Sequence, residues 1–134
     1  KKMVFNRMAR QAFANRKAER YSKVGREMED RVSSLLKRAS RNNQPLFLKV
    51  IYHQPNSEMD CDGADFTVEK LIDGRVYSVT FGISISPKCC NQSKAKHPDR
   101  LQMCFPININ DSTIVKKVEK LFNDPSFLKY LERE

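Results

Sequence analysis

The segment DCDGADFTVEK, residues 60–70, concentrates three aspartates and a glutamate in a chain whose net charge is +9. Carboxylates at this density are typical of a calcium loop, an acidic turn or a site for Mg²⁺. A calcium loop of the EF-hand type needs an acidic residue at its fifth position, which here is Ala64, and a helix on each side. The sequence that follows is strand-like instead, so it does not favour the calcium alternative.

Two of these aspartates are expected to have a local structural role. Asp60 and Asp62 precede Gly63, and Asp and Gly are frequent in turns because Asp hydrogen-bonds nearby backbone and Gly accepts positive φ. Asp65 differs because it stands just before the apolar residues of a strand, where a charge is costly without a partner such as a metal ion. We therefore interpret Asp60 and Asp62 as turn residues and Asp65 as a metal ligand.

The cysteines are expected to be reduced thiols in a cytoplasmic protein. Adjacent Cys89 and Cys90 do not resemble the disulfide framework of a small secreted domain, and Cys61 and Cys104 stand apart from them. An alternative is a zinc site formed by Cys89, Cys90, His97 and Cys104. The chain contains no CxxC or HxxxH spacing, which would make a zinc prediction specific.

The basic charge is concentrated in the first third of the chain. Residues 1–41 contain 13 Lys and Arg against 4 Asp and Glu, a balance of +9, and residues 42–134 contain 12 of each. A basic segment on a neutral body suits a phosphate backbone or an anionic membrane surface, and the simplest alternative is a solvated helix face. No segment has the roughly 18 apolar residues needed to span a bilayer, so we expect no membrane-spanning helix.

The apolar pattern predicts a mixed α/β protein. Two helical pieces are expected at about 4–22 and 25–40, separated at Gly25. The dipeptide at 73–74, Asp-Gly, is a hairpin signal. The other expected elements are strands at about 46–53, 64–72, 75–86 and from 101 to near 106, a polar loop or short helix at 87–100, and helices at about 110–122 and from Asp124 onward. We divide the chain into a basic helical arm, residues 1–24, and an α/β domain, residues 25–134.

Three segments, GREMEDRVSSLL (25–36), GADF (63–66) and VYSVTFGISISPK (76–88), follow one another along the chain. In this order they resemble the PD-(D/E)XK restriction-endonuclease-like superfamily, and the resemblance spans about residues 25–125. In that family a first helix carries a glutamate in a pattern like G-x-x-x-E, which Glu29 fits. A following strand carries an aspartate, often as G-x-D, which Asp65 fits.

The resemblance implies a restriction-endonuclease-like core, a mixed sheet of about four strands flanked by helices. It also implies a metal-dependent DNA nuclease that hydrolyses phosphodiester bonds with Mg²⁺ or Mn²⁺. Asp65 would be the main metal ligand and Glu29 a second. Glu69 is a further candidate because, four residues after Asp65, it falls on the same face of the strand.

The third motif departs from the family's pattern. The family carries an acidic residue and a lysine two positions apart on the next strand, whereas residues 75–88 contain no Asp or Glu. Ser86 and Lys88 take these positions, and Lys94 or Lys96 would supply a displaced lysine. The catalytic residues implied by the resemblance are Glu29, Asp65, Ser86 and Lys88. With a carboxylate missing, a weaker metal affinity is expected.

DNA is the expected partner, held by basic side chains that contact phosphates without reading sequence. These are Arg7, Arg10, Arg16, Lys17, Arg20, Lys23, Lys88, Lys94, Lys96 and Arg100. One alternative is a catalytically inactive protein of the same fold that binds nucleic acid or a protein partner. Another is an oligomerising protein whose N-terminal helix forms a homodimer, and the apolar residues available for it are Val4, Phe5, Met8, Ala12 and Phe13.

Overall fold

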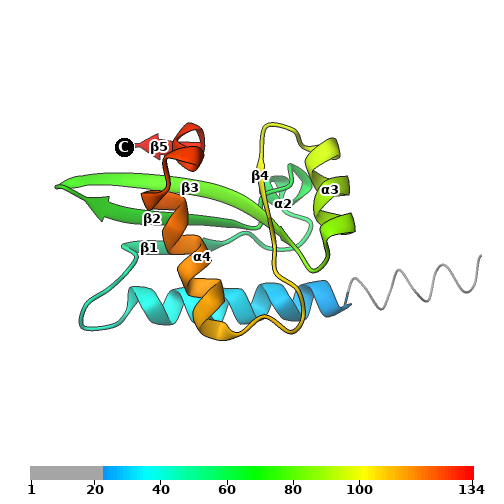
Figure 1. Ribbon diagram of the computed structural model, residues 1–134, viewed down its shortest axis with the longest axis horizontal. Helices are drawn as coiled ribbons and strands as arrows, with labels where there is room; N and C mark the ends of the chain where they lie inside the picture. The colour runs from blue at the N-terminus through cyan, green and yellow to red at the C-terminus, as the bar shows by residue number, and fades with distance from the viewer. Residues whose placement is uncertain (1–22) are drawn as a thin grey trace, which may run out of the picture.

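Five strands form one mixed sheet in the computed structural model, which describes residues 23–134 (Figure 1). The strands are β1 (Lys49–Tyr52), β2 (Phe66–Ile72), β3 (Arg75–Ser84), β4 (Leu101–Cys104) and β5 (Leu131–Arg133). Their order is β1-β2-β3-β4, and β5 also pairs with β3. Neighbouring strands are antiparallel except β3 and β4, which are parallel. The mixed α/β class is therefore confirmed.

The β2–β3 hairpin is the longest pairing in the sheet. Asp73 and Gly74 both have positive φ, 51° and 78°, as the tight turn predicted from their sequence requires. The turn sets a register in which Phe66 faces Phe81 and Val68 faces Val79. β3 continues to Ser84, beyond the start of β2, so the two strands separate at the end opposite the turn.

The helices surround this sheet and differ from the prediction in detail. They are a helix of residues 23–40, called here the long helix, α2 (Glu58–Cys61), α3 (Pro87–Lys96), α4 (Asp111–Asn123) and the 3₁₀ helix η1 (Pro125–Tyr130). The segment at 87–100, which the sequence left open between loop and helix, forms α3 with Ser86 as its N-cap. α2 and β5 were not predicted from the sequence. The helical piece predicted at 4–22 lies outside the described residues.

The sequence predicted a break at Gly25. In the structure Gly25 lies inside the long helix, since residues 23 and 24 are also helical. Glycine is tolerated within a helix at a cost of about 1 kcal/mol relative to alanine. The apolar stripe on this helix compensates for that cost, because Met28, Val32 and Leu36 recur every four residues and are buried.

The hydrophobic core lies between one face of the sheet and two helices. Phe66, Val68, Val79 and Phe81 from the hairpin have no exposed surface. The helices add Met28, Val32, Leu36 and Ala39 from the long helix and Ile114, Val118, Leu121 and Phe122 from α4. Each fully buried side chain of this size contributes about 1.5–3 kcal/mol to folding. This packing fixes the long helix against the hairpin.

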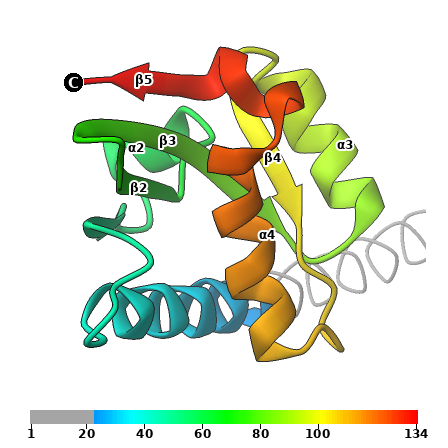
Figure 2. The same cartoon turned by 60° about the vertical axis from the view of Figure 1, so that its left-hand side comes forward.

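One polar contact also joins the two helices of the core. The Arg31 guanidinium donates from Nε to Asp111 Oδ1 at 2.8 Å and from Nη2 to the Ile109 carbonyl at 2.6 Å. α4 therefore begins directly beside the long helix. Figure 2 shows α3 on the opposite side of β4 from α4. Within residues 23–134, no helix combines the length and apolar character needed to cross a bilayer.

We expect Gly25→Ala to raise the free energy of unfolding by about 0.5–1 kcal/mol, because a methyl group at this helical position would meet no atom within 4 Å. Gly74→Ala is the matched control. It also meets no atom, but its φ of 78° disfavours alanine, so it should destabilise the protein. Urea denaturation of the three proteins measures both effects, and a destabilising Gly25→Ala would contradict the helical assignment.

Candidate metal centre

Three carboxylates from three segments meet where β2 and β3 separate. Glu29 comes from the long helix, Asp60 from α2, and Asp65 from the residue just before β2. Each offers one oxygen atom, and these three atoms lie within 4.8 Å of one another. Among residues 23–134, this is the only group of three or more side chains placed to hold a metal ion. The sequence singled out Glu29 and Asp65, and the structure brings them together.

Glu29 borders the apolar stripe of the long helix. Its helical neighbours Met28 and Val32 are buried in the core, and Glu29 itself is half-buried. One of its oxygens, Oε1, is shielded from solvent and has no hydrogen-bond partner among the described residues. A shielded carboxylate oxygen without a partner is costly. Glu29 therefore needs either a proton or a cation at this position.

Asp65 is held by the backbone at the point where the strands separate. Its Oδ2 accepts a hydrogen bond from the Ile83 N–H at 2.7 Å, a donor on β3 that lies beyond the start of β2. Its own N–H donates to the Phe81 carbonyl at 2.9 Å, and its carbonyl accepts from the His53 N–H at 2.8 Å. These bonds fix the backbone of Asp65 and one oxygen of its side chain.

Asp60 joins the cluster through the short helix α2, whereas the sequence assigned it only a role in a turn. The Ser57 hydroxyl caps α2 by accepting from the Asp60 N–H at 3.3 Å, and Asp60 Oδ2 accepts from the Asn56 N–H at 2.8 Å. Asp62 ends α2 and is exposed, in agreement with its predicted turn position. Ser57 followed by acidic residues is an N-cap signal that could have revealed this helical turn.

Burial raises the pKa of both core-facing acids. Burial first, and then the Asp65 carboxylate, raise the pKa of Glu29 from an ordinary 4.5 to about 8. Burial raises the pKa of Asp65 to about 6, although the hydrogen bond from Ile83 acts in the opposite direction. Two carboxylates this close cannot both ionise without a compensating charge. At neutral pH without a cation, the Glu29–Asp65 pair therefore retains a proton.

Tyr52 lies at the edge of the cluster. Its ring stacks on Phe66 with the ring centroids 5.0 Å apart. Burial, and then the negative charges of Glu29 and Asp30, raise the pKa of the Tyr52 hydroxyl. The hydroxyl therefore remains protonated throughout the physiological range.

The cluster suits a hard divalent cation. Mg²⁺ and Mn²⁺ prefer oxygen ligands, and Mg²⁺ is commonly held by one or two carboxylates together with water. Oxygens bound to one Mg²⁺ at about 2.1 Å are about 3.0 Å apart when adjacent and about 4.2 Å apart when opposite, so the three side chains would draw closer together around the ion. Such an ion would also neutralise the charge of Glu29, whose Oε1 has no hydrogen-bond partner among the described residues. Glu29, Asp60 and Asp65 therefore fit such an ion.

Glu69 does not belong to the cluster. It pairs with Ser78 in the hairpin, four residues along β2 from Asp65, which corresponds to about 13 Å of strand. A hydrogen bond with the Glu134 carboxyl, followed by burial, raises the pKa of Glu69. Glu69 alternates with the buried Val68, so it points away from the core face of β2, and it lies too far along the strand to join the cluster.

The two residues proposed for the third motif also lie outside the cluster. β3 ends at Ser84, so Ser86 and Lys88 belong to the following helix. Ser86 is the N-cap of α3, where its hydroxyl accepts from the Cys89 N–H at 3.2 Å. Lys88 is exposed in the first turn of α3. Helix capping explains why a serine stands at this position.

The residue of β3 that faces the long helix at the cluster is apolar. Side chains alternate along a strand, so Ile83 shares the face of the buried Phe81, and Ser84 points to the other face. Ile83 is also the residue whose N–H donates to Asp65. The sequence reasoning took the serine face of this strand as the functional one, whereas the isoleucine face is turned toward Glu29.

The predicted phosphate contacts fall into several regions. Lys94 and Lys96 are exposed on α3 with Lys88, and Lys23 is exposed on the long helix. Arg100 is half-buried. The pKa of His53 is lowered, first by the burial of His53 and then by the positive charge of Arg100, while the negative charge of Asp60 acts in the opposite direction. The remaining predicted contacts, Arg7, Arg10, Arg16, Lys17 and Arg20, and the apolar residues proposed for a homodimer lie outside the described residues.

The cysteines are separate from the cluster. Cys61, Cys89, Cys90 and Cys104 are all free. In the described part of the chain the last three do not form a metal-holding group with His97. The structure therefore gives no support to the zinc alternative.

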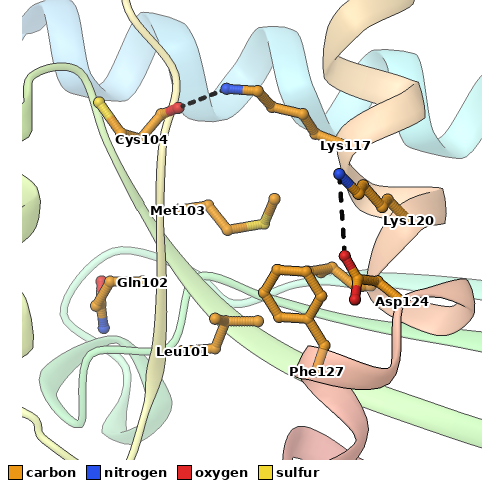
Figure 3. Close-up of a pocket in the computed structure, with 9 residues that line it drawn as sticks. Leu101, Gln102, Met103, Cys104, Lys117, Lys120, Asp124 and Phe127 are labelled. Atoms are coloured by element: carbon orange, nitrogen blue, oxygen red, sulfur yellow. Dashed lines mark hydrogen bonds and ion pairs between the residues drawn. The ribbon is translucent and has the colours of Figure 1, made fainter.

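A hollow of about 290 Å³ lies away from the cluster, between β4, α4 and η1 (Figure 3). Leu101, Met103 and Phe127 provide apolar walls. The charged groups at its rim interact with the surrounding protein, since Lys117 donates to the Cys104 carbonyl at 3.4 Å and Lys120 pairs with Asp124 at 3.9 Å. These contacts hold the walls of the hollow together.

No model of a known protein family, no curated protein sequence and no solved structure matches this chain.

Without a divalent cation, we expect the free energy of unfolding to fall as pH rises from about 4 to about 8. The folded pKa values of Asp65 and Glu29 exceed their ordinary values, so both bind protons more tightly when folded. That stabilisation is complete below the ordinary pKa values and is lost as pH rises through about 6 and about 8. Glu29→Gln should remove most of the dependence between pH 6 and 8, whereas Glu27→Gln, an exposed change on the same helix, should not. Urea denaturation in EDTA measures this, and equal pH slopes for Glu29→Gln and the parent would refute it.

Adding Mn²⁺ should raise the melting temperature of the parent, and more at pH 8 than at pH 6, because the cation binds ionised carboxylates and displaces protons. Asp60→Asn should lower the shift clearly, since Asp60 contributes one oxygen of the cluster. Asp62→Asn is the matched control, because Asp62 is exposed two residues away and outside the cluster. Equal Mn²⁺ shifts in the two variants would exclude Asp60 as a ligand.

Proposed function

We propose that this chain is a divergent member of the PD-(D/E)XK restriction-endonuclease-like superfamily and acts as a metal-dependent DNA nuclease-like domain. The observation that carries the proposal is that the carboxylates of Glu29 and Asp65, the two acidic residues that fit the family's motifs, lie within 4.8 Å of each other. They are 36 residues apart in the sequence and come from a helix and a strand, the two elements that the resemblance assigns to them. Asp60 adds a third carboxylate.

The arrangement of elements supports the same proposal. A helix carrying the glutamate precedes three antiparallel strands, and the aspartate stands at the start of the second of them. A further helix then leads to a strand parallel to the third. This is a mixed sheet with helices on both sides, as the resemblance leads us to expect, although a likeness in fold does not determine activity.

The site suits phosphodiester hydrolysis through charge rather than through a nucleophilic side chain. A bound Mg²⁺ or Mn²⁺ would polarise the phosphoryl oxygen and lower the pKa of an attacking water. Glu29, Asp60 and Asp65 would hold the ion, and the Ile83 N–H would keep Asp65 in position.

A second candidate is a metal-binding protein of the same fold without nuclease activity. Ile83 favours it, because an apolar side chain stands where a carboxylate of the third motif would face the cluster. Lys88 also favours it, because it is exposed on α3 and is not in the cluster. Such a protein would bind DNA or a protein partner and would retain the cation for structure.

We expect the parent to cleave supercoiled DNA with Mn²⁺ or Mg²⁺, and Asp65→Asn to lose about 100-fold or more of this activity, the scale of losing one group that stabilises the transition state. Asparagine is preferred to alanine because its carbonyl can still accept from the Ile83 N–H. Asp62→Asn should retain the activity, and EDTA should abolish it. Gel electrophoresis of matched preparations measures the rate.

The same assay separates the two candidates. A parent that shows an Mn²⁺-dependent melting shift but no cleavage supports the second candidate. Ile83→Glu then becomes informative, because it places a carboxylate beside Asp65, and a gain of cleavage would identify the lost group. Cleavage that is equal in the parent and in Asp65→Asn would contradict the nuclease proposal and indicate a contaminating enzyme.

A further inference from the structure

A basic hollow of about 380 Å³ lies at the C-terminal end of the long helix. Its lining consists of Ser34, Lys37, Arg38, Arg41 and Asn42. Three of these side chains are cations, two are neutral hydrogen-bonding groups, and none is a carboxylate. This set, called here the cradle, offers donors of the kind that bind phosphate oxygens.

The cations of the cradle are not used to hold the fold. The ion pairs among residues 23–134 join Arg31 to Asp111 and Lys120 to Asp124, so none involves Lys37, Arg38 or Arg41. Arg38 and Arg41 are exposed, and Lys37 is half-buried. Three positive charges around one hollow repel one another, and an anion in the hollow would relieve that repulsion.

The helix terminus alone does not explain this arrangement. The negative end of a helix dipole favours a basic residue in the last turn, so one or two cations would be expected there. The helix dipole does not explain why these cations surround a hollow. It also does not explain why Ser34, about one helical turn before Lys37 and Arg38, lines the same hollow. The simplest alternative is therefore a stabilising contact with the dipole, and it predicts a loss of stability rather than of binding when the cations are removed.

The position of the cradle relative to the acidic cluster suits a DNA backbone. Lys37, Arg38 and Arg41 follow Glu29 by 8, 9 and 12 residues on or directly after the same helix, which corresponds to about 12–18 Å along the axis and about 80–180° around it. Phosphates on one strand of duplex DNA are spaced about 3.4 Å along its axis. A duplex whose axis runs along the long helix, with one phosphate at the cluster, would therefore present others to the cradle about four to five base pairs away.

We propose that the cradle binds the phosphate backbone of duplex DNA and positions it along the long helix for the acidic cluster. The choice of DNA as ligand rests on the proposed function, whereas the binding itself does not require cleavage or a metal ion. The sequence assigned phosphate contacts to the arm and to α3, and the cradle adds a third region on the long helix.

The test is fluorescence anisotropy of the full chain with a labelled 16-base-pair duplex, in EDTA, over a series of KCl concentrations. Lys37→Gln/Arg38→Gln/Arg41→Gln should weaken binding about 10-fold or more at 100 mM KCl, and should reduce the slope of log K against log[KCl] by about 2–3. The control Arg75→Gln/Lys129→Gln/Arg133→Gln removes the same charge from exposed positions on the hairpin and the C-terminal segment, and should change the slope by much less.

Because EDTA removes the metal, this result is independent of whether the parent cleaves DNA. Arg38→Gln/Arg41→Gln, which changes only exposed side chains, serves if the triple variant does not fold, and should reduce the slope by about 1–2. Equal slopes for the cradle and control variants, no binding by the parent, or a lower melting temperature with unchanged binding would each overturn the proposal. Loss of binding to phosphatidylserine vesicles without loss of duplex binding would overturn it too, because the phosphate source would then be a lipid.

Discussion

The burial of Glu29 beside Asp65 is the constraint that decides the chemistry of the acidic cluster. Two carboxylates in a partly desolvated site repel each other, so the pair must hold either a proton or a cation. The fold satisfies only part of this need, since the Ile83 N–H serves Asp65 while Glu29 Oε1 has no hydrogen-bond partner among the described residues. A retained proton meets this need without a cation, and the divalent cation that we propose would take its place on the same oxygens.

The geometry of the pair follows from strand register and helix packing. The Asp73–Gly74 turn aligns Phe66 with Phe81, which leaves the Ile83 N–H beyond the start of β2 and free to bond Asp65. The apolar stripe of the long helix packs on the same face of the sheet, and Glu29 lies next to that stripe. A shift of one residue in the hairpin would turn Asp65 to the other face and separate it from Glu29. The site is thus specified by the same contacts that form the core.

Much of this could be predicted from the sequence, because local signals were strong. The hairpin followed from alternating residues around an Asp-Gly turn, and Glu29 and Asp65 followed from their resemblance to family motifs. Asp60 was assigned to a turn because its place in the cluster depends on α2, a single helical turn set by the Ser57 cap. The serines of β3 suggested a polar site on their face of the strand, whereas Ile83, whose N–H binds Asp65, packs against the core. β5 is three residues long and is defined by its pairing with β3, so no local sequence pattern predicts it.

The most direct test of the metal centre is a two-dimensional amide NMR spectrum of the full chain recorded with substoichiometric Mn²⁺. The paramagnetic ion broadens resonances near it, and the Ile83 amide, which bonds to Asp65, is the closest backbone reporter that the structure identifies. We expect the Ile83 amide to disappear first while that of Leu128, on η1, stays sharp, and we expect Asp65→Asn to abolish the effect. Broadening that spares Ile83, or that persists unchanged in Asp65→Asn, would contradict the assignment of a cation site to Glu29, Asp60 and Asp65.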